Sequence, residues 1–259
     1  MKYASDYRNI AYGALWGNWM MAVLAGFIAF LMGAAGSSLS LNGTLSDDQL
    51  QMLRANPSWP QIYPILLTVL IIYFVWTIIK FVISGAAYFG YIKFNLKLVD
   101  GENATLSDLF SQFHRLGDGI CMNILLNLFI SLWSLLFFIP GFIKKYSYAM
   151  TPYIMAENPN ITVTEAITRS RHMMYGNKWR LFCLDFSFIG WMLLCNLPFM
   201  IAAVVLGVNA VHNTDISVLL HIIPFLLISF IASLFLIPYQ SAARAAFYRD
   251  IAGHPTQQS

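Results

Sequence analysis

The segment "IYPILLTVLIIYFVWTIIKFVISGAAYFG", residues 62–90, decides the fold class, and Lys80 is its only charged side chain. A helix needs about 20 consecutive apolar residues to cross the hydrocarbon core of a bilayer. This segment is long enough to span a membrane as one helix. Lys80 lies toward its end, where a long side chain can reach the interface with water.

The composition of the whole chain agrees with this interpretation. Hydrophobic residues make up 58% of the 259 residues, charged residues 10%, and the mean hydropathy is +0.63. Soluble domains carry about 25% charged residues. The net charge of +3 is small, so it does not indicate nucleic acid as a partner. We therefore expect an integral membrane protein.

Further apolar segments predict an all-α, polytopic membrane bundle of about six transmembrane helices in one domain, residues 1–259. Each of these segments except the fourth is long enough to span. The predicted helices are 10–35, 62–90, 120–139, 142–157, 181–207 and 217–240.

Lys and Arg residues predict the orientation, because they concentrate in cytoplasmic loops. They lie in both terminal segments and in residues 91–119 and 158–180. The loops 36–61 and 208–216 carry only Arg54. We therefore expect both termini on the cytoplasmic side and these two loops outside.

Residues 142–157 are short and polar for a spanning helix, since they include Lys144 and Lys145. Residues 91–119 and 158–180, on either side of this region, are both expected in the cytoplasm. After the 120–139 helix the chain must therefore return to the cytoplasmic side, and residues 142–157 are the predicted return arm. Pro140-Gly141 is the predicted turn. The arm either crosses as a sixth helix or forms half of a re-entrant hairpin that other helices cover.

Two cytoplasmic segments, 105–117 and 162–176, are predicted to form amphipathic helices at the membrane interface. Each begins with a Thr that has an acidic residue three positions later, and each closes at a Gly. Gly17-Asn18-Trp19 resembles Gly176-Asn177-Lys178-Trp179. These similarities indicate three repeats, each an interfacial helix followed by a transmembrane hairpin. The alternative is that a helix cap and a Gly mark any helix that enters the membrane from the cytoplasm.

Polar residues inside the predicted spans form a candidate intramembrane site. Such residues usually face the bundle interior, where they bind one another, ligands or ions. The alternative roles are hydrogen bonds between helices and, for Asp185, an ion pair with Lys144, Lys145, Lys178 or Arg180. The candidate residues are Lys144, Asp185, Asn127, Asn123 and Asn196.

Basic residues of the second interfacial segment are candidate contacts for anionic phospholipid headgroups, with Ile167, Met174 and Trp179 in the acyl boundary. Plain anchoring on the cytoplasmic side is the alternative. These candidates are Arg169, Arg171, Lys178 and Arg180. Small residues such as Ala22-x-x-x-Gly26 favour close helix packing, within the monomer or in a homo-oligomer.

Motifs of catalysis and of metal binding are not found in the sequence. Cys121, Cys183 and Cys195 lie in apolar segments without zinc-ligand spacing. No hydrolytic triad, phosphate loop or nucleotide fingerprint occurs. We therefore expect no catalytic residue, metal or cofactor, and no enzymatic activity.

Three segments resemble the integral-membrane family catalogued as domain of unknown function 975. They are "IPGFIKKYSYAMTPYIMAENP" (139–159), "EAITRSRHMMYGNKWRLFCLDFSFIGW" (165–191) and "PYQSAARAAFYRD" (238–250). Where this chain has Lys144 and Lys145, the family pattern has one lysine, which falls on Lys144. The resemblance implies a polytopic protein of bacterial cell membranes, mostly Gram-positive, with no established activity.

These observations lead to three hypotheses of function. The first is a non-enzymatic membrane protein that contacts lipid or another membrane protein through its basic amphipathic helices. The second is a small transporter or channel with a polar path between the repeats, lined by Lys144, Asp185 and Asn127. The third is an intramembrane enzyme. Partners would be the bilayer, a membrane protein or a second copy of the chain.

Overall fold

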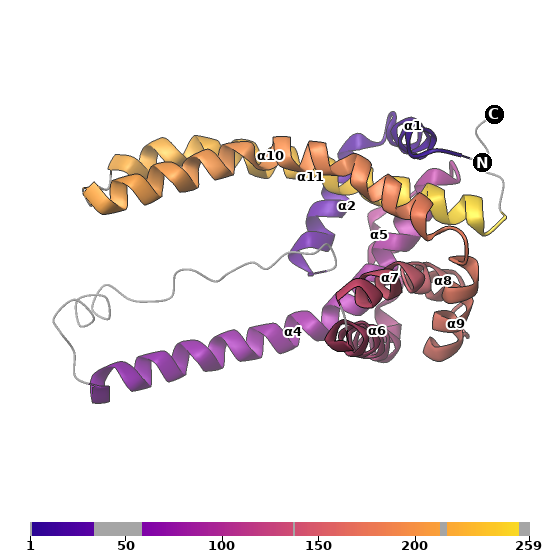
Figure 1. Ribbon diagram of the computed structural model, residues 1–259, viewed down its shortest axis with the longest axis horizontal. Helices are drawn as coiled ribbons and strands as arrows, with labels where there is room; N and C mark the ends of the chain where they lie inside the picture. Colours follow the sequence, from indigo (N-terminus) through magenta and orange to yellow (C-terminus); the bar gives the residue numbers. More distant parts are fainter. Residues whose placement is uncertain (1, 34–58, 137, 213–216, 254–259) are drawn as a thin grey trace.

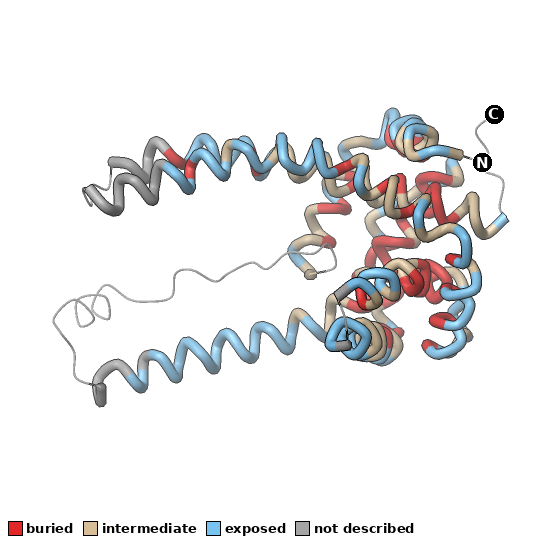
Figure 2. The backbone as a smooth tube through the Cα atoms, in the orientation of Figure 1, coloured by how far each residue is buried: buried red, intermediate tan, exposed pale blue. Residues whose placement is uncertain are grey.

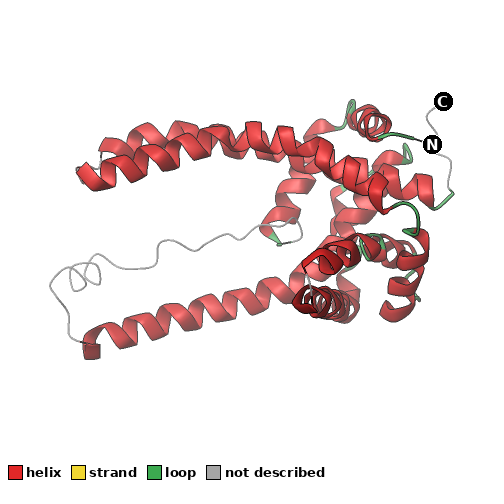
Figure 3. Cartoon of the chain, in the orientation of Figure 1, coloured by secondary structure: helices red, strands yellow, loops and turns green. Residues whose placement is uncertain are grey.

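The computed structural model describes residues 2–33, 59–136, 138–212 and 217–253. Within these ranges the chain is helical and has no strand, which confirms the all-α prediction (Figure 3). The helices are α1 Ala4–Leu15, α2 Trp19–Leu31, α4 Trp59–Val99, α5 Leu106–Phe110, the 3₁₀ helix η1 Phe113–Arg115, α6 Leu116–Leu136, α7 Phe138–Ser147, α8 Thr151–Glu157, α9 Val163–Met173, α10 Lys178–His212 and α11 Ser217–Ile251.

Three long helices project from a packed group of shorter ones (Figure 1). We call the projecting parts the arms: α4 up to residue 81, α10 from residue 189 and α11 up to residue 237. The base consists of α1, α5 to α9 and the inner ends of α4, α10 and α11. Side chains of the arms are mostly exposed and the buried residues gather in the base (Figure 2).

Four helical segments are long and apolar enough to cross a membrane, and a fifth arises if α1 and α2 form one bent span. The four are Leu66–Val99, Leu106–Leu135, Lys178–Val204 and Ile222–Ile251. The predicted count of six is not confirmed. Residues 142–157 do not form one helix, because they lie in the short helices α7 and α8. Thr151 to Ala156 of α8 are buried in the base.

The predicted helix 10–35 is divided in two. α1 and α2 are bent by 104° at a short break, where Gly17 has φ +84°. Glycine adopts this left-handed backbone at little cost, so Gly17 permits the sharp change of direction. α2 buries its small residues Ala22, Ala25, Gly26 and Ala29 within the monomer.

Pro140-Gly141 is not the turn after α6, because both residues lie inside the first turns of α7. Proline is tolerated near a helix start, where backbone N–H groups have no helical partner. A Cβ atom on Gly141 would lie 2.0 Å from Ser134 Oγ of α6. Gly141 therefore lets α7 lie closely against α6.

The two predicted interfacial segments have different structures. Residues 105–117 contain α5, η1 and the start of α6, and Gly117 lies inside α6. Residues 162–176 contain α9, where Thr162 Oγ1 accepts a hydrogen bond from Glu165 N. Gly176 follows with φ +79°, close to the φ of Gly17. Two of the three predicted repeats thus share a turn with a left-handed glycine, Gly17 or Gly176. The three-fold repeat of the whole chain stays a prediction.

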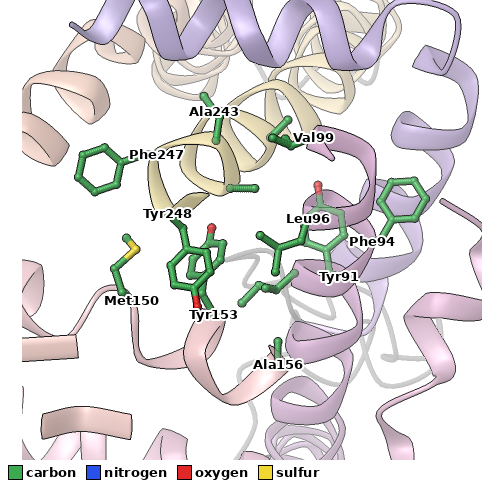
Figure 4. Close-up of a cluster of buried hydrophobic side chains, with 14 of the residues drawn as sticks. Tyr91, Phe94, Leu96, Val99, Met150, Tyr153, Ala156, Ala243, Phe247 and Tyr248 are labelled. Carbon is green, nitrogen blue, oxygen red and sulfur yellow. The ribbon is translucent and has the colours of Figure 1, made fainter. Parts of the chain in front are cut away.

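Figure 4 shows a part of the core to which α4, α8 and α11 contribute buried side chains. Tyr153 of α8 stacks on Tyr248 of α11, with ring centroids 5.2 Å apart. α9 packs against α8 and buries Ile167, while Met174 after it is also buried. These two side chains therefore pack in the core, and of the three expected in the acyl boundary only Trp179 is exposed.

Candidate functional site

An ion pair between α10 and α11 lies at the centre of the candidate site. Arg244 Nε is 2.9 Å from Asp185 Oδ1, and Tyr146 Oη of α7 donates a hydrogen bond to Asp185 Oδ2 at 3.3 Å. Burial and the negative charge of Asp185 raise the pKa of Tyr146 to about 12. The phenol is therefore protonated at neutral pH and acts as a donor.

Two cavities meet at Arg244, and Tyr88 and Tyr153 also line both of them. The first has a volume of about 220 Å³ and is lined by Tyr146 and Asp185. Its lining brings together α4, α6, α7, α8, α10 and α11. Burial raises the pKa of Tyr153 well above its usual value, so this phenol stays protonated at neutral pH.

The second cavity has a volume of about 380 Å³ and combines polar with apolar walls. Asn95 of α4 and Gln240 and Ser241 of α11 provide polar groups beside Arg244. Met192 and Ile237 come from the inner ends of the two neighbouring arms. The cavity therefore lies where the base meets the arms.

Two further networks of ion pairs hold α11 to the rest of the base. Arg180 of α10 is 2.7 Å from Asp250 Oδ2, and both side chains contact the hydroxyl of Tyr7 in α1. Arg249 pairs with Asp100 at the end of α4 and with Glu157 of α8.

The structure places the predicted polar residues apart, and only Asp185 lines one of the two cavities. Lys144 Nζ lies 4.4 Å from the ring centroid of Trp133, a cation–π contact. It is Lys145 that lines the first cavity. The predicted pairing of Lys144 with Asp185 is not observed, and Arg244 takes that place.

The three asparagines bind backbone or a neighbouring helix instead of a common site. Asn123 Nδ2 donates to Ser84 Oγ of α4 at 3.5 Å. Asn127 and Asn196 are exposed, and each donates to the carbonyl four residues earlier in its own helix. Only Asn123 therefore links two helices.

The four predicted headgroup contacts also differ in their surroundings. Arg180 belongs to the network with Asp250 and Tyr7, so it ties helices of the base together. Arg169 is exposed and pairs with Glu165 of its own helix at 3.4 Å. Arg171 is exposed and Lys178 is half-buried.

Sequence reasoning missed Arg244, Tyr88 and Tyr153 as parts of the site. Arg244 and Asp185 lie 59 residues apart, and the arginine was counted only for its positive charge in the C-terminal segment. Its position in an apolar helix was the available signal, because a charge there requires a partner. In the described part of the chain, no three His, Cys, Asp or Glu side chains could hold a metal ion.

Replacing Asp185 with asparagine is expected to lower the free energy of unfolding by about 1–2 kcal/mol, because the arginine loses its charged partner. SDS-induced unfolding in mixed micelles measures this change. The control is Asn196→Ala on the same helix, which removes only an exposed bond and should stay within about 0.5 kcal/mol of wild type. Equal effects of the two variants would contradict the role of the pair.

Residues 136–254 match a family described as protein of unknown function (DUF975), which confirms the resemblance over that part of the chain. The match includes α7 to α11, and so Asp185 and Arg244, while Tyr88 and Asn95 of α4 lie outside it. Comparison with curated proteins and with solved structures finds no similar protein.

Proposed function

We propose that this protein is a non-enzymatic, multi-pass protein of a bacterial cell membrane, whose base lies on the cytoplasmic side with both termini. One observation carries this proposal: three helices change from exposed to buried where the arms meet the base. In α4, side chains from Leu66 to Ile79 are exposed, whereas Gly85 to Ala87 are buried. Apolar helices exposed over this length are stable in hydrocarbon, where every backbone group bonds within the helix.

The distribution of positive charge supports the cytoplasmic side for the base. Of the fifteen Lys and Arg residues, thirteen lie in the base or beside α1 at its start, and Arg54 falls outside the described residues. Lys80 lies at the inner end of the α4 arm, close to where burial begins. Positive charges gather on the cytoplasmic side of membrane proteins.

The surroundings of α9 favour a protein over lipid as the partner of the base. Its apolar face is already packed in the core, so it cannot enter a bilayer. Figure 1 places α9 at the end of the base away from the arms. Its exposed side carries Arg169, Arg171 and His172, which suit an acidic protein surface.

Labelling of single cysteines tests the topology. In a chain whose three native cysteines are replaced by alanine, Arg171→Cys should react with a membrane-impermeant maleimide in inside-out vesicles but not in intact cells. Phe74→Cys, in the exposed part of the α4 arm, should react in neither. Labelling of residue 171 from outside, or of residue 74 in either preparation, would contradict the proposal.

A comparison of bilayers distinguishes lipid from protein contact. We expect the difference in stability between wild type and the double variant Arg169→Gln, Arg171→Gln to be the same in nanodiscs of phosphatidylcholine and in nanodiscs containing phosphatidylglycerol. Contact with headgroups would instead cost about 1 kcal/mol per residue in the anionic nanodiscs only. That result would assign α9 to lipid.

A further inference from the structure

We propose that the second cavity binds a small organic acid that carries a hydrogen-bond donor beside its carboxylate, as 2-hydroxy acids and amino acids do. The proposal goes beyond the membrane role above, because it assigns a ligand to a cavity where the base meets the arms. It rests on three features of the cavity wall: a guanidinium group with free donors, a buried amide oxygen without a donor, and an apolar side.

Arg244 provides the group that would hold the carboxylate. Its Nε is used by Asp185, but in the described part of the chain its two terminal nitrogens make no hydrogen bond or ion pair. The side chain keeps 38% of its surface accessible, because it faces the cavities. A guanidinium edge with two N–H groups matches the two oxygens of a carboxylate.

Asn95 provides the second contact and decides the class of ligand. The residue is 2% exposed, and its Nδ2 donates to the Tyr91 carbonyl at 2.7 Å. Its Oδ1 is buried and has no hydrogen-bond partner within the described residues. An amide oxygen only accepts, and a buried acceptor without a donor is costly. A bare carboxylate cannot satisfy it, whereas an added O–H or N–H group can.

Charge and shape agree with this class. Asp185 balances the charge of Arg244, so the cavity has no excess positive charge that would favour a dianion. Ile92, Met192 and Ile237 form an apolar side that suits an aliphatic side chain. A volume of about 380 Å³ lies within the usual range for sites of small molecules.

Three probes with one carbon skeleton test the proposal: 4-methylpentanoate, 2-hydroxy-4-methylpentanoate and leucine. They differ only in carrying hydrogen, hydroxyl or ammonium at carbon 2. Isothermal titration calorimetry on the full chain in nanodiscs should show binding of the hydroxy acid, the amino acid or both, at least tenfold tighter than the unsubstituted acid. Comparison of the hydroxy acid with leucine shows whether the site prefers a hydroxyl or an ammonium group as the donor. No binding of either, or equal binding of all three, would overturn the proposal without any variant.

Two variants then locate the contacts. Asn95→Leu should remove the preference for the donor-bearing probe, because leucine lacks the acceptor oxygen Oδ1 of Asn95. Arg244→Lys should weaken binding of all three probes at least tenfold, since lysine lacks the planar fork. Asn196→Leu, an exposed asparagine outside the cavity, is the matched control and should bind like wild type. If Asn95→Leu folds and keeps the wild-type preference, Asn95 does not contact the ligand and the proposal fails.

Discussion

Replacing Arg249 with methionine is expected to lower the free energy of unfolding by about 3 kcal/mol. Arg249 is the shared partner of Asp100 and Glu157, and only 12% of its side chain is exposed. Its Nε lies 2.8 Å from Asp100 Oδ1. Methionine fills the space but leaves two partly buried carboxylates without a cation. Removing one partner of a buried ion pair typically costs about 3–5 kcal/mol, and the lower end applies because both carboxylates keep some access to water.

Titration of the purified chain in mixed micelles with SDS as the denaturant measures this loss. Arg169→Met is the matched control, because Arg169 forms an exposed pair on α9 and such pairs contribute less than about 1 kcal/mol. The triple variant Arg249→Met, Asp100→Asn, Glu157→Gln should recover part of the stability, since it removes the uncompensated charges. Equal, small effects of Arg249→Met and Arg169→Met would show that the network adds no stability.

Gly90→Ala is expected to destabilise the base by about 3 kcal/mol or to displace α5. A Cβ atom on Gly90 would lie 2.0 Å from the carbonyl oxygen of Leu109. That neighbour is backbone, so no side-chain rotation relieves the clash. Forcing extra volume into a packed site costs about 1–3 kcal/mol and sometimes more, and this contact belongs at the upper end.

Gly190→Ala is the matched control for this substitution. Gly190 also lies inside a long helix, but nothing is found within 4 Å of its added Cβ. Alanine there should leave stability unchanged or raise it by about 0.5–1 kcal/mol, because glycine weakens helix interiors. Melting temperatures from intrinsic tryptophan fluorescence compare the two variants. Similar melting temperatures would mean that α4 and α5 do not approach as closely as the structure shows.

The helical membrane class could be predicted from the sequence because composition and segment length depend on local residues. The N-cap residue Thr162 and the turn at Gly176 were also recognisable, since capping acts within a few residues. The exposed stretch of α4 from Leu66 to Ile79 lies within the 62–90 segment. The predicted external loop 36–61 falls mostly outside the described residues, as does the end of the loop 208–216.

Hydropathy failed where an apolar segment is covered by protein and not by lipid. Residues 142–157 appeared to be a return arm, but α8 is buried inside the base. A short apolar helix in a core and half of a membrane span have similar compositions. The segment 10–35 appeared continuous because Gly17 interrupts it without changing its mean hydropathy.

The ion pairs were beyond sequence reasoning for a different reason. Arg249 and Asp100 lie 149 residues apart in the chain, so their meeting depends on how α4 and α11 pack. Asp185 had several candidate cations by charge alone, and the structure pairs it with Arg244 and places Lys144 against Trp133. Pairing of distant charges therefore required the three-dimensional arrangement.

With the topology proposed above, the division into arms and base means that one chain is folded in two different solvents. The arms keep their backbone hydrogen bonds in hydrocarbon whether or not the base is intact, whereas the base depends on side-chain packing and on ion pairs. The base then unfolds in a transition of its own, and the free energies of unfolding above refer to that transition. Loss of the base would change far-ultraviolet circular dichroism much less than the fluorescence of residues near the core such as Trp19, which packs against it. Helicity would therefore overstate how much of the native structure survives.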